Sequence, residues 1–230
     1  MLDGDIMFRK IPILLIFMFI IITVLLTNYR VGIDKLITFS AVFIIIFFLL
    51  LFELKQTNVR KMAIISTLAT LGGMLRIPFA IIPGLQPTTF IISVSGYTLG
   101  PTEGFIVGSI AAFISNFFLG HGPWTLWQML GWGLCGLFFG WMKKIKLNRY
   151  FFALFCGLWG YIYGIILDMW YVVGFIKPIS FYAIILGIIG SFPFDTMHAA
   201  GNVLLSLTFA DKFINIINRF TTRFEVEYLD

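Results

Sequence analysis

Long apolar runs, interrupted by glycine, proline and charged residues, follow one another along the whole chain. The runs are continuous, so they lack the alternation of apolar and polar residues over about ten positions that marks membrane β-strands. Their length favours membrane-crossing helices, which need roughly 20 apolar residues. The pattern predicts spans at residues 11–27, 36–52, 62–80, 85–99, 104–119, 124–142, 151–173 and 191–210.

Two apolar stretches need separate treatment. The segment Ile179–Gly190 is short for a span and is bracketed by prolines, so we expect it to be interfacial or re-entrant. The first run follows Arg9 and Lys10, as the apolar part of a signal peptide would, but residues 27–30 offer no small-residue cleavage site. We expect this run to remain as a helix.

Composition and charge turn this pattern into a topology. Hydrophobic residues make up 60% of the chain and charged residues 12%, which is typical of a polytopic helical membrane protein. The formal net charge of +5 therefore indicates orientation rather than affinity for nucleic acid. If the N-terminus is cytoplasmic, the basic residues on the inner side are Arg9, Lys10, Lys55, Arg60, Lys61, Lys143, Lys144, Lys146, Arg149, Lys212, Arg219 and Arg223. Those outside are only Arg30, Lys35, Arg76 and Lys177. The positive-inside rule thus predicts eight spans with both termini in the cytoplasm.

The predicted spans divide the chain into three parts. Residues 1–55 hold two spans, residues 62–210 hold six, and residues 211–230 form a cytoplasmic tail. The expected fold class is an all-α polytopic membrane protein. Because the first two spans consist mainly of Phe, Ile and Leu, we expect an accessory pair of helices that faces membrane lipid.

Polar and tryptophan side chains within or beside the spans gather toward the predicted external side. They are Gln86, Thr88, Asn116, His121, Trp124, Trp127, Gln128, Asp168, Trp170, Asp195, His198 and Asn202. Asp195, His198 and Asn202 are spaced by three and four residues, so they share one helical face. A charged side chain near the bilayer centre costs about 2.5–3.5 kcal/mol, so such groups usually face a partner or a cavity. This convergence predicts an externally open ligand site.

A structural interpretation of the same residues stays open. Ser191 could cap the last helix, Asp195 could pair with His198, and nothing would bind. Trp124 and Trp127 could belong to the aromatic belt that membrane proteins form at the interface.

The sequence argues against catalysis. It contains no phosphate-binding GxxxxGK[ST] motif, so the chain cannot by itself hydrolyse ATP. It has only two histidines and no HExxH or Cys-x-x-Cys motif. We interpret Cys135 and Cys156 as small buried hydrophobic residues and Glu103 as a helix N-terminal residue. No catalytic residue, metal site or cofactor is predicted.

Three stretches resemble the substrate-binding S component of energy-coupling factor (ECF) vitamin transporters. They are PGLQPTTFIISVSGYTLGPTEGFIVG at residues 83–108, SNFFLGHGPWTLWQMLGWGLCGLFFG at residues 115–140 and FPFDTMHAAGN at residues 192–202. The resemblance implies a six-helix fold over residues 62–210, preceded here by two extra helices, with an outward-facing pocket. It also implies substrate contacts from the loops Arg76–Gln86, Leu119–Trp124 and Trp170–Ser191.

The resemblance further implies a role and partners. An S component captures a vitamin in the prokaryotic plasma membrane, and a separate transmembrane subunit with two ATPase subunits drives its import. Cobalamin ranks first among the candidate substrates. The family docks through small residues on its first helix, which correspond here to Ala63, Ser66, Ala69, Thr70 and Gly73.

Three other functions compete with this one. A proton-coupled secondary transporter would also use Asp168, Asp195 and His198, although such transporters usually contain paired halves, and no internal similarity is visible. A structural subunit of a larger membrane complex would bind no ligand. An enzyme that acts on lipid is the weakest alternative.

Overall fold

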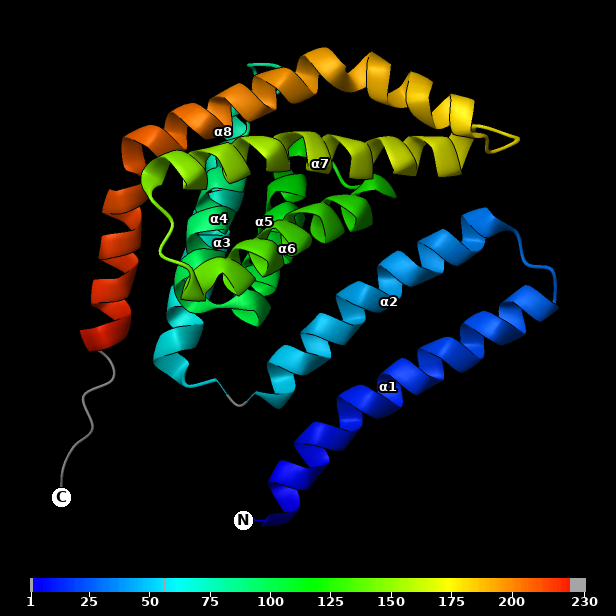
Figure 1. Ribbon diagram of the computed structural model, residues 1–230, viewed down its shortest axis with the longest axis horizontal. Coiled ribbons are helices and arrows are strands. Elements are labelled where there is room, and N and C mark those ends of the chain that lie inside the picture. The colour runs from blue at the N-terminus through cyan, green and yellow to red at the C-terminus, as the bar shows by residue number, and fades with distance from the viewer. Residues whose placement is uncertain (1, 56, 224–230) are drawn as a thin grey trace. The chain divides into compact units, whose positions relative to one another are not determined.

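The computed structural model is all-α over the residues it describes, which are residues 2–55 and 57–223 of the backbone and residues 11–55 and 57–222 of the side chains. The chain divides into two compact units between residues 56 and 57. The α-helices of this described part are α1 (Leu2–Asn28), α2 (Ile33–Leu54), α3 (Val59–Phe79), α4 (Pro87–Leu99), α5 (Pro101–Leu119), α6 (Trp124–Trp141), α7 (Arg149–Phe175) and α8 (Phe181–Arg223), with a short 3-10 helix η1 (Met142–Lys144) after α6 (Figure 1).

The first unit is a helical hairpin of α1 and α2. The ring of Phe19 on α1 stacks on the rings of Phe39 and Phe43 of α2, with centroid distances of 5.7 and 4.3 Å. Many apolar side chains of α1, such as Ile13 and Phe17, are exposed. Both helices are long and apolar enough to cross a membrane. That they form a lipid-facing accessory pair stays a prediction.

The second unit is built around α4. All thirteen residues of this helix except Tyr97 are buried, and α4 contacts every other α-helix of the unit. Its thirteen residues extend about 20 Å, which is shorter than the hydrocarbon layer of about 30 Å. A short helix is tolerated here because its neighbours, rather than lipid, surround it.

Within the described part of the chain, six helices are long and apolar enough to span a membrane: α1, α2, α3, α5, α7 and α8. Each of the eight predicted segments lies in a helix, which confirms their helical structure. The eight membrane crossings and their orientation stay predictions.

Asparagine side chains begin two of these helices. The Asn58 side chain accepts a hydrogen bond from the backbone N–H of Lys61 at 2.8 Å, and Asn148 accepts one from Phe151 at 2.9 Å. These bonds satisfy backbone donors that have no partner within the helix. Pro87 and Pro101 stand at the first positions of α4 and α5, where the missing N–H costs nothing.

Small residues let the helices of the second unit pack closely. A Cβ atom on Gly136 of α6 would collide with the backbone of Gly104 on α5, so both positions require glycine. Along α7, Gly160 packs against the backbone of Ala199 on α8. Such close approach is typical of helix pairs in membranes, and Figure 1 shows α7 and α8 side by side.

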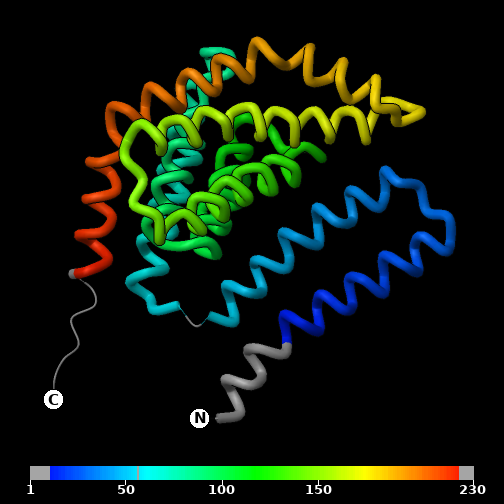
Figure 2. The backbone as a smooth tube through the Cα atoms, viewed as in Figure 1, coloured from blue at the N-terminus to red at the C-terminus, as the bar shows by residue number. Residues whose placement is uncertain are grey.

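The last helix corrects one expectation. The prediction that Ile179–Gly190 is a segment separate from the span 191–210 is wrong. From Phe181 onward both belong to one helix, which runs to Arg223. Pro193 lies inside this helix, and the path of α8 in Figure 2 is bent rather than straight. The predicted loop Trp170–Ser191 shrinks to residues 176–180, and the predicted tail is helical through Arg223. Residues 224–230 of that tail lie outside the described residues.

Candidate functional site

A polar network occupies the end of the second unit where α3 ends and α6 begins. Arg76, in the last turn of α3, donates from Nε to Gln86 Oε1 at 3.2 Å. Its Nη1 donates to Ser115 Oγ at 2.9 Å and to Asn116 Oδ1 at 2.8 Å, both in the last turn of α5. One guanidinium therefore joins α3, the loop before α4, and α5.

Asn116 extends this network to α6. Its Nδ2 donates to Thr125 Oγ1 at 2.9 Å and to Gln128 Oε1 at 2.7 Å. Asn116, Thr125 and Gln128 are buried, so these bonds are protected from competition with water. We call Arg76, Gln86, Ser115, Asn116, Thr125 and Gln128 the Arg76 cluster.

An aromatic layer lies against the Arg76 cluster. The guanidinium carbon of Arg76 is 5.0 Å from the ring centroid of Trp132, which is fully buried and stacks on Tyr163 at 4.5 Å. Trp132 Nε1 donates to Thr89 Oγ1 at 2.9 Å, and Thr89 Oγ1 lies 2.7 Å from His198 Nε2. The layer thereby connects α4, α6, α7 and α8.

A pair of carboxyl groups meets at the contact of α7 and α8. Ser191 Oγ lies 2.7 Å from Asp168 Oδ2 and 2.8 Å from Asp195 Oδ2. Gly164 makes room for the Asp195 carboxyl, since a Cβ there would overlap it. Because a serine hydroxyl has one proton to donate and lone pairs that accept, Ser191 can donate to one carboxylate while a protonated carboxyl group donates to it.

These contacts differ from the structural interpretation, in which Asp195 pairs with His198 and Ser191 caps the last helix. The side-chain partner of His198 is Thr89 and that of Asp195 is Ser191, so the Asp195–His198 pair of the structural interpretation is not found among the described residues. Ser191 lies inside α8 and does not cap a helix. Asp195, His198 and Asn202 are all buried, as expected for residues on one inward helical face.

Tryptophans and His121 lie beside the Arg76 cluster at the start of α6 and the end of α7. The rings of Trp124 and Trp170 meet edge to face at 5.9 Å. Trp127 is buried. His121 is exposed, its Nδ1 lies 3.5 Å from Thr125 Oγ1, and its ring contacts that of Phe117 at 4.8 Å.

Two further predicted residues, Thr88 and Asn202, join neighbouring helices. Thr88 donates to the backbone oxygen of Gly72 at 2.8 Å, and Asn202 donates to that of Cys156 at 3.2 Å. Both side chains are fully buried, as are Cys135 and Cys156. Their recorded bonds hold α3 to α4 and α7 to α8.

Sequence reasoning missed the residues at the centre of this arrangement. Arg76 was counted only as an external charge and a loop boundary, and Trp132, Tyr163 and Ser115 were not singled out. Arg76 carried a signal, because a lone arginine among apolar residues is expensive in a membrane. Trp132 and Tyr163 carried none, since aromatic residues are common throughout these helices.

The predicted docking residues fall on two sides of α3. Ala69 and Gly73 are buried, and a Cβ on Gly73 would lie 2.9 Å from the backbone oxygen of Ala111 on α5. Ala63, Ser66 and Thr70 are exposed. Of these five residues, only the exposed three are accessible to a partner helix in this structure, and docking through them stays a prediction.

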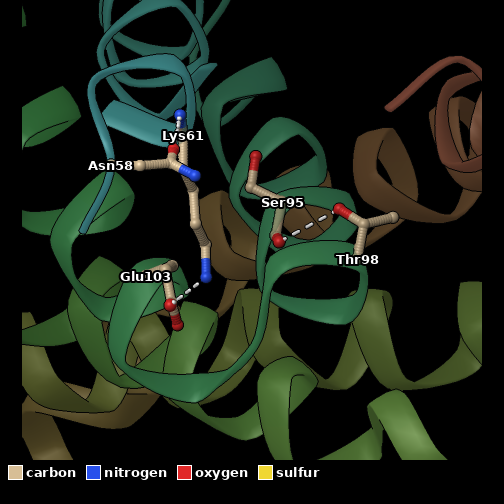
Figure 3. A network of polar contacts seen from close by, with 5 residues as sticks. All are labelled: Asn58, Lys61, Ser95, Thr98 and Glu103. Carbon is tan, nitrogen blue, oxygen red and sulfur yellow. Dashed lines mark hydrogen bonds and ion pairs between the residues drawn. The ribbon is translucent and has the colours of Figure 1, made fainter. Parts of the chain in front are cut away.

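The opposite end of the unit holds a second polar group (Figure 3). Lys61 Nζ lies 2.6 Å from Glu103 Oε1, and Glu103 is completely buried. Glu103 is in the first turn of α5, as expected, but its ion pair with α3 was not foreseen. Beside it is a cavity of about 230 Å³, whose lining includes Lys61, Thr98 and Lys143. Within the described part of the chain, no three His, Cys, Asp or Glu side chains gather as metal ligands would.

Comparison with known proteins gives one family. The family model described as "ECF transporter, substrate-specific component" matches residues 60–210. A UPF0397 protein of Aliivibrio fischeri is 33% identical over 99 residues, which cover 42% of this chain and 54% of that protein. UPF0397 proteins of Vibrio atlanticus (32% over 89 residues; 38% and 48% covered) and Aliivibrio salmonicida (30% over 105 residues; 45% and 57% covered) are also similar. The chain spans about half the length of these curated relatives, and no solved structure matches it.

Proposed function

Since this chain belongs to the substrate-specific components of ECF transporters, we propose that it captures a micronutrient at the Arg76 cluster and the adjoining aromatic residues. Family membership makes it a multi-pass protein of a prokaryotic membrane and a binding subunit of a transporter rather than an enzyme. The observation that carries the proposal is the Arg76 cluster itself, in which side chains from α3, α5, α6 and the loop before α4 meet at one end of an apolar bundle.

The chemistry of this end suits a partly flat, partly polar molecule. Trp124 and Trp170 offer aromatic surface, and Gln86 and Gln128 offer amide groups that can fix polar edges. His121, Asp168, Asp195 and His198 add polar groups nearby. Cobalamin remains the first-ranked substrate, on the resemblance of the QPTT and GPWTLWQ stretches.

The charge pattern supports an outward orientation of this site. Cysteine at position 123 is therefore expected to react with a membrane-impermeant thiol reagent added outside intact cells, and cysteine at position 146 is expected to stay unlabelled. Pro123 and Lys146 are both exposed, whereas a side chain at Gly122 would collide with the Trp124 ring. The native Cys135 and Cys156 are fully buried and give little background. Labelling at 146 but not at 123 would place the site on the cytoplasmic side and contradict the proposal.

For energy the chain depends on partners. We propose that an ECF transmembrane subunit with two ATPase subunits reorients this protein, and that it docks on the exposed small residues of α3. Ala63, Ser66, Thr67 and Thr70 are exposed and recur at helical spacing along one side of α3. An apolar groove of about 440 Å³ between α3 and α8 adjoins this side, with Ala63 and Thr67 in its lining.

Thr67→Leu tests the docking surface. We expect uptake by the assembled transporter to fall at least about tenfold, because a larger side chain keeps the helices apart, while substrate binding by the separate protein stays unchanged. Thr208→Leu on α8 is a matched control, since both threonines are exposed and each hydroxyl bonds the carbonyl four residues earlier. Equal uptake by Thr67→Leu and Thr208→Leu would exclude this surface.

Reconstitution in vesicles separates the transporter classes. With the ECF module present, uptake of radiolabelled cobalamin or another vitamin that binds is expected to require ATP on the cytoplasmic side. The short contacts of Ser191 with Asp168 and Asp195 are the observation that favours a proton-coupled secondary transporter, because carboxyl groups inside a membrane often relay protons. Uptake by this protein alone, driven by a pH gradient, would support that second function and contradict the first.

A further inference from the structure

Among the side chains that the structure describes, the positive charge of Arg76 has no acidic partner. Arg76 is half-buried, and its recorded hydrogen bonds go to the neutral oxygens of Gln86, Ser115 and Asn116. No carboxylate is within ion-pair distance of it among the side chains that the structure describes. Neutral acceptors hold the guanidinium in place, but they do not cancel its charge, and the face of Trp132 compensates only part of it.

Lys61, which is also half-buried, does have an acidic partner. At the opposite end, Lys61 is paired with the buried Glu103 at 2.6 Å. The Asp168 and Asp195 side chains of α7 and α8 are instead hydrogen-bonded to Ser191. The chain thus supplies a counter-ion at one end of the second unit and omits it at the other.

Several hydrogen-bond donors of the Arg76 cluster are not used within it. The side-chain oxygens of Gln86, Asn116 and Gln128 each accept a bond already. Within the described side chains, no partner is recorded for Arg76 Nη2 or for the Nε2 atoms of Gln86 and Gln128. All three nitrogens carry protons, so the cluster offers donors that a ligand with acceptor oxygens can use.

We propose that the Arg76 cluster binds an anionic group, a carboxylate or a phosphate, of the captured substrate; this inference rests on the function proposed above. A guanidinium fits both groups, because its N–H donors lie in one plane and can make parallel bonds to two oxygens. Arg76 supplies charge and orientation, and Gln86 and Gln128 supply additional donors. Cobalamin, which carries one phosphodiester, meets this requirement.

Matched pairs of probes test the proposal on the purified full chain in detergent. The carboxylate pairs are biotin with biotin methyl ester and pantothenate with pantothenol, and the phosphate pair is riboflavin 5′-phosphate with riboflavin. Cobalamin and other vitamins complete the panel. Equilibrium binding of the wild type is expected to favour the anionic member of the pair that binds by at least tenfold, and the pair that responds distinguishes carboxylate from phosphate.

Variants then assign the preference to one residue. Arg76→Gln keeps hydrogen bonding and removes the charge, so affinity for the anionic probe is expected to fall at least tenfold more than affinity for its neutral partner. Arg76→Lys should retain part of the preference. Arg149→Gln is the matched control, because Arg149 also lies over an aromatic ring, that of Tyr150, but at the other end of the unit.

The outcomes separate this inference from the proposed function. If the folded wild type binds no probe of the panel, the proposed function fails and this inference fails with it. If it binds neutral molecules as tightly as anionic ones, only this inference is overturned. An anionic preference that persists in folded Arg76→Gln would move the anion site to another residue. The comparison within the wild type stands even if Arg76→Gln does not fold.

Discussion

Replacing Trp132 with alanine is expected to lower the free energy of unfolding by about 3–5 kcal/mol, as large-to-small changes of buried aromatic residues do. The Trp132 side chain is fully buried, stacks on Tyr163 at 4.5 Å and donates to Thr89 at 2.9 Å. Its loss leaves a cavity and removes the aromatic face beneath Arg76. The measurement is the midpoint of thermal or denaturant-induced unfolding in detergent.

Trp141→Ala is the matched control for this change. Trp141 is on the same helix, α6, but is 66% exposed, so its truncation creates no internal cavity. We expect the Trp141→Ala midpoint to stay close to that of the wild type. Equal stability of Trp132→Ala and the wild type would show that the aromatic layer does not hold α4, α6, α7 and α8 together.

Trp124→Ala is expected to weaken substrate binding about tenfold or more while leaving stability nearly unchanged. Trp124 is 36% exposed and meets Trp170 edge to face, so it presents aromatic surface at the start of α6. Stacking of a flat ring on an aromatic side chain is worth about 1–3 kcal/mol in nucleic-acid binding, which is the nearest analogue. Equilibrium binding of the vitamin that the wild type binds provides the measurement.

The same control applies to this second prediction. If Trp124 only belongs to an aromatic belt at the membrane interface, Trp124→Ala and Trp141→Ala should reduce binding equally and only as far as they reduce stability. A tenfold loss confined to Trp124→Ala would assign the residue to the substrate site. Unchanged affinity in a folded Trp124→Ala protein would remove it from that site.

The helices of this protein were predictable because apolar runs and their interruptions are local features. Asn58, Asn148, Pro87 and Pro101 mark helix starts by chemistry that needs no tertiary contact. Pro193 misled the same reasoning. A proline removes one backbone hydrogen bond, and packing of α8 against α7 holds the helix together across it.

The polar cluster was predictable in part. Gln86, Asn116 and Gln128 stood out as amides among apolar residues, and the structure connects all three. Their connector, Arg76, was not assigned to the site, because its partners are 10, 39 and 40 positions away and such pairing depends on how helices pack. Which small residues of α3 are buried was not predictable for a similar reason. Ala69 and Gly73 are as small as the exposed Ala63, and helix packing, which brings Gly73 against α5, decides which of them are buried.

Equilibrium binding of cobalamin, and then of the other water-soluble vitamins, to the purified full chain without any ATPase subunit tests the central claim most directly. The account predicts that the folded wild type binds one of them, and that Asn116→Leu, which breaks the bonds to Arg76, Thr125 and Gln128, abolishes the binding. Leu158→Ala, at an exposed position of α7, should bind as the wild type does. A folded wild type that binds none of these vitamins, or an Asn116→Leu protein that binds as tightly as the wild type, would contradict the account.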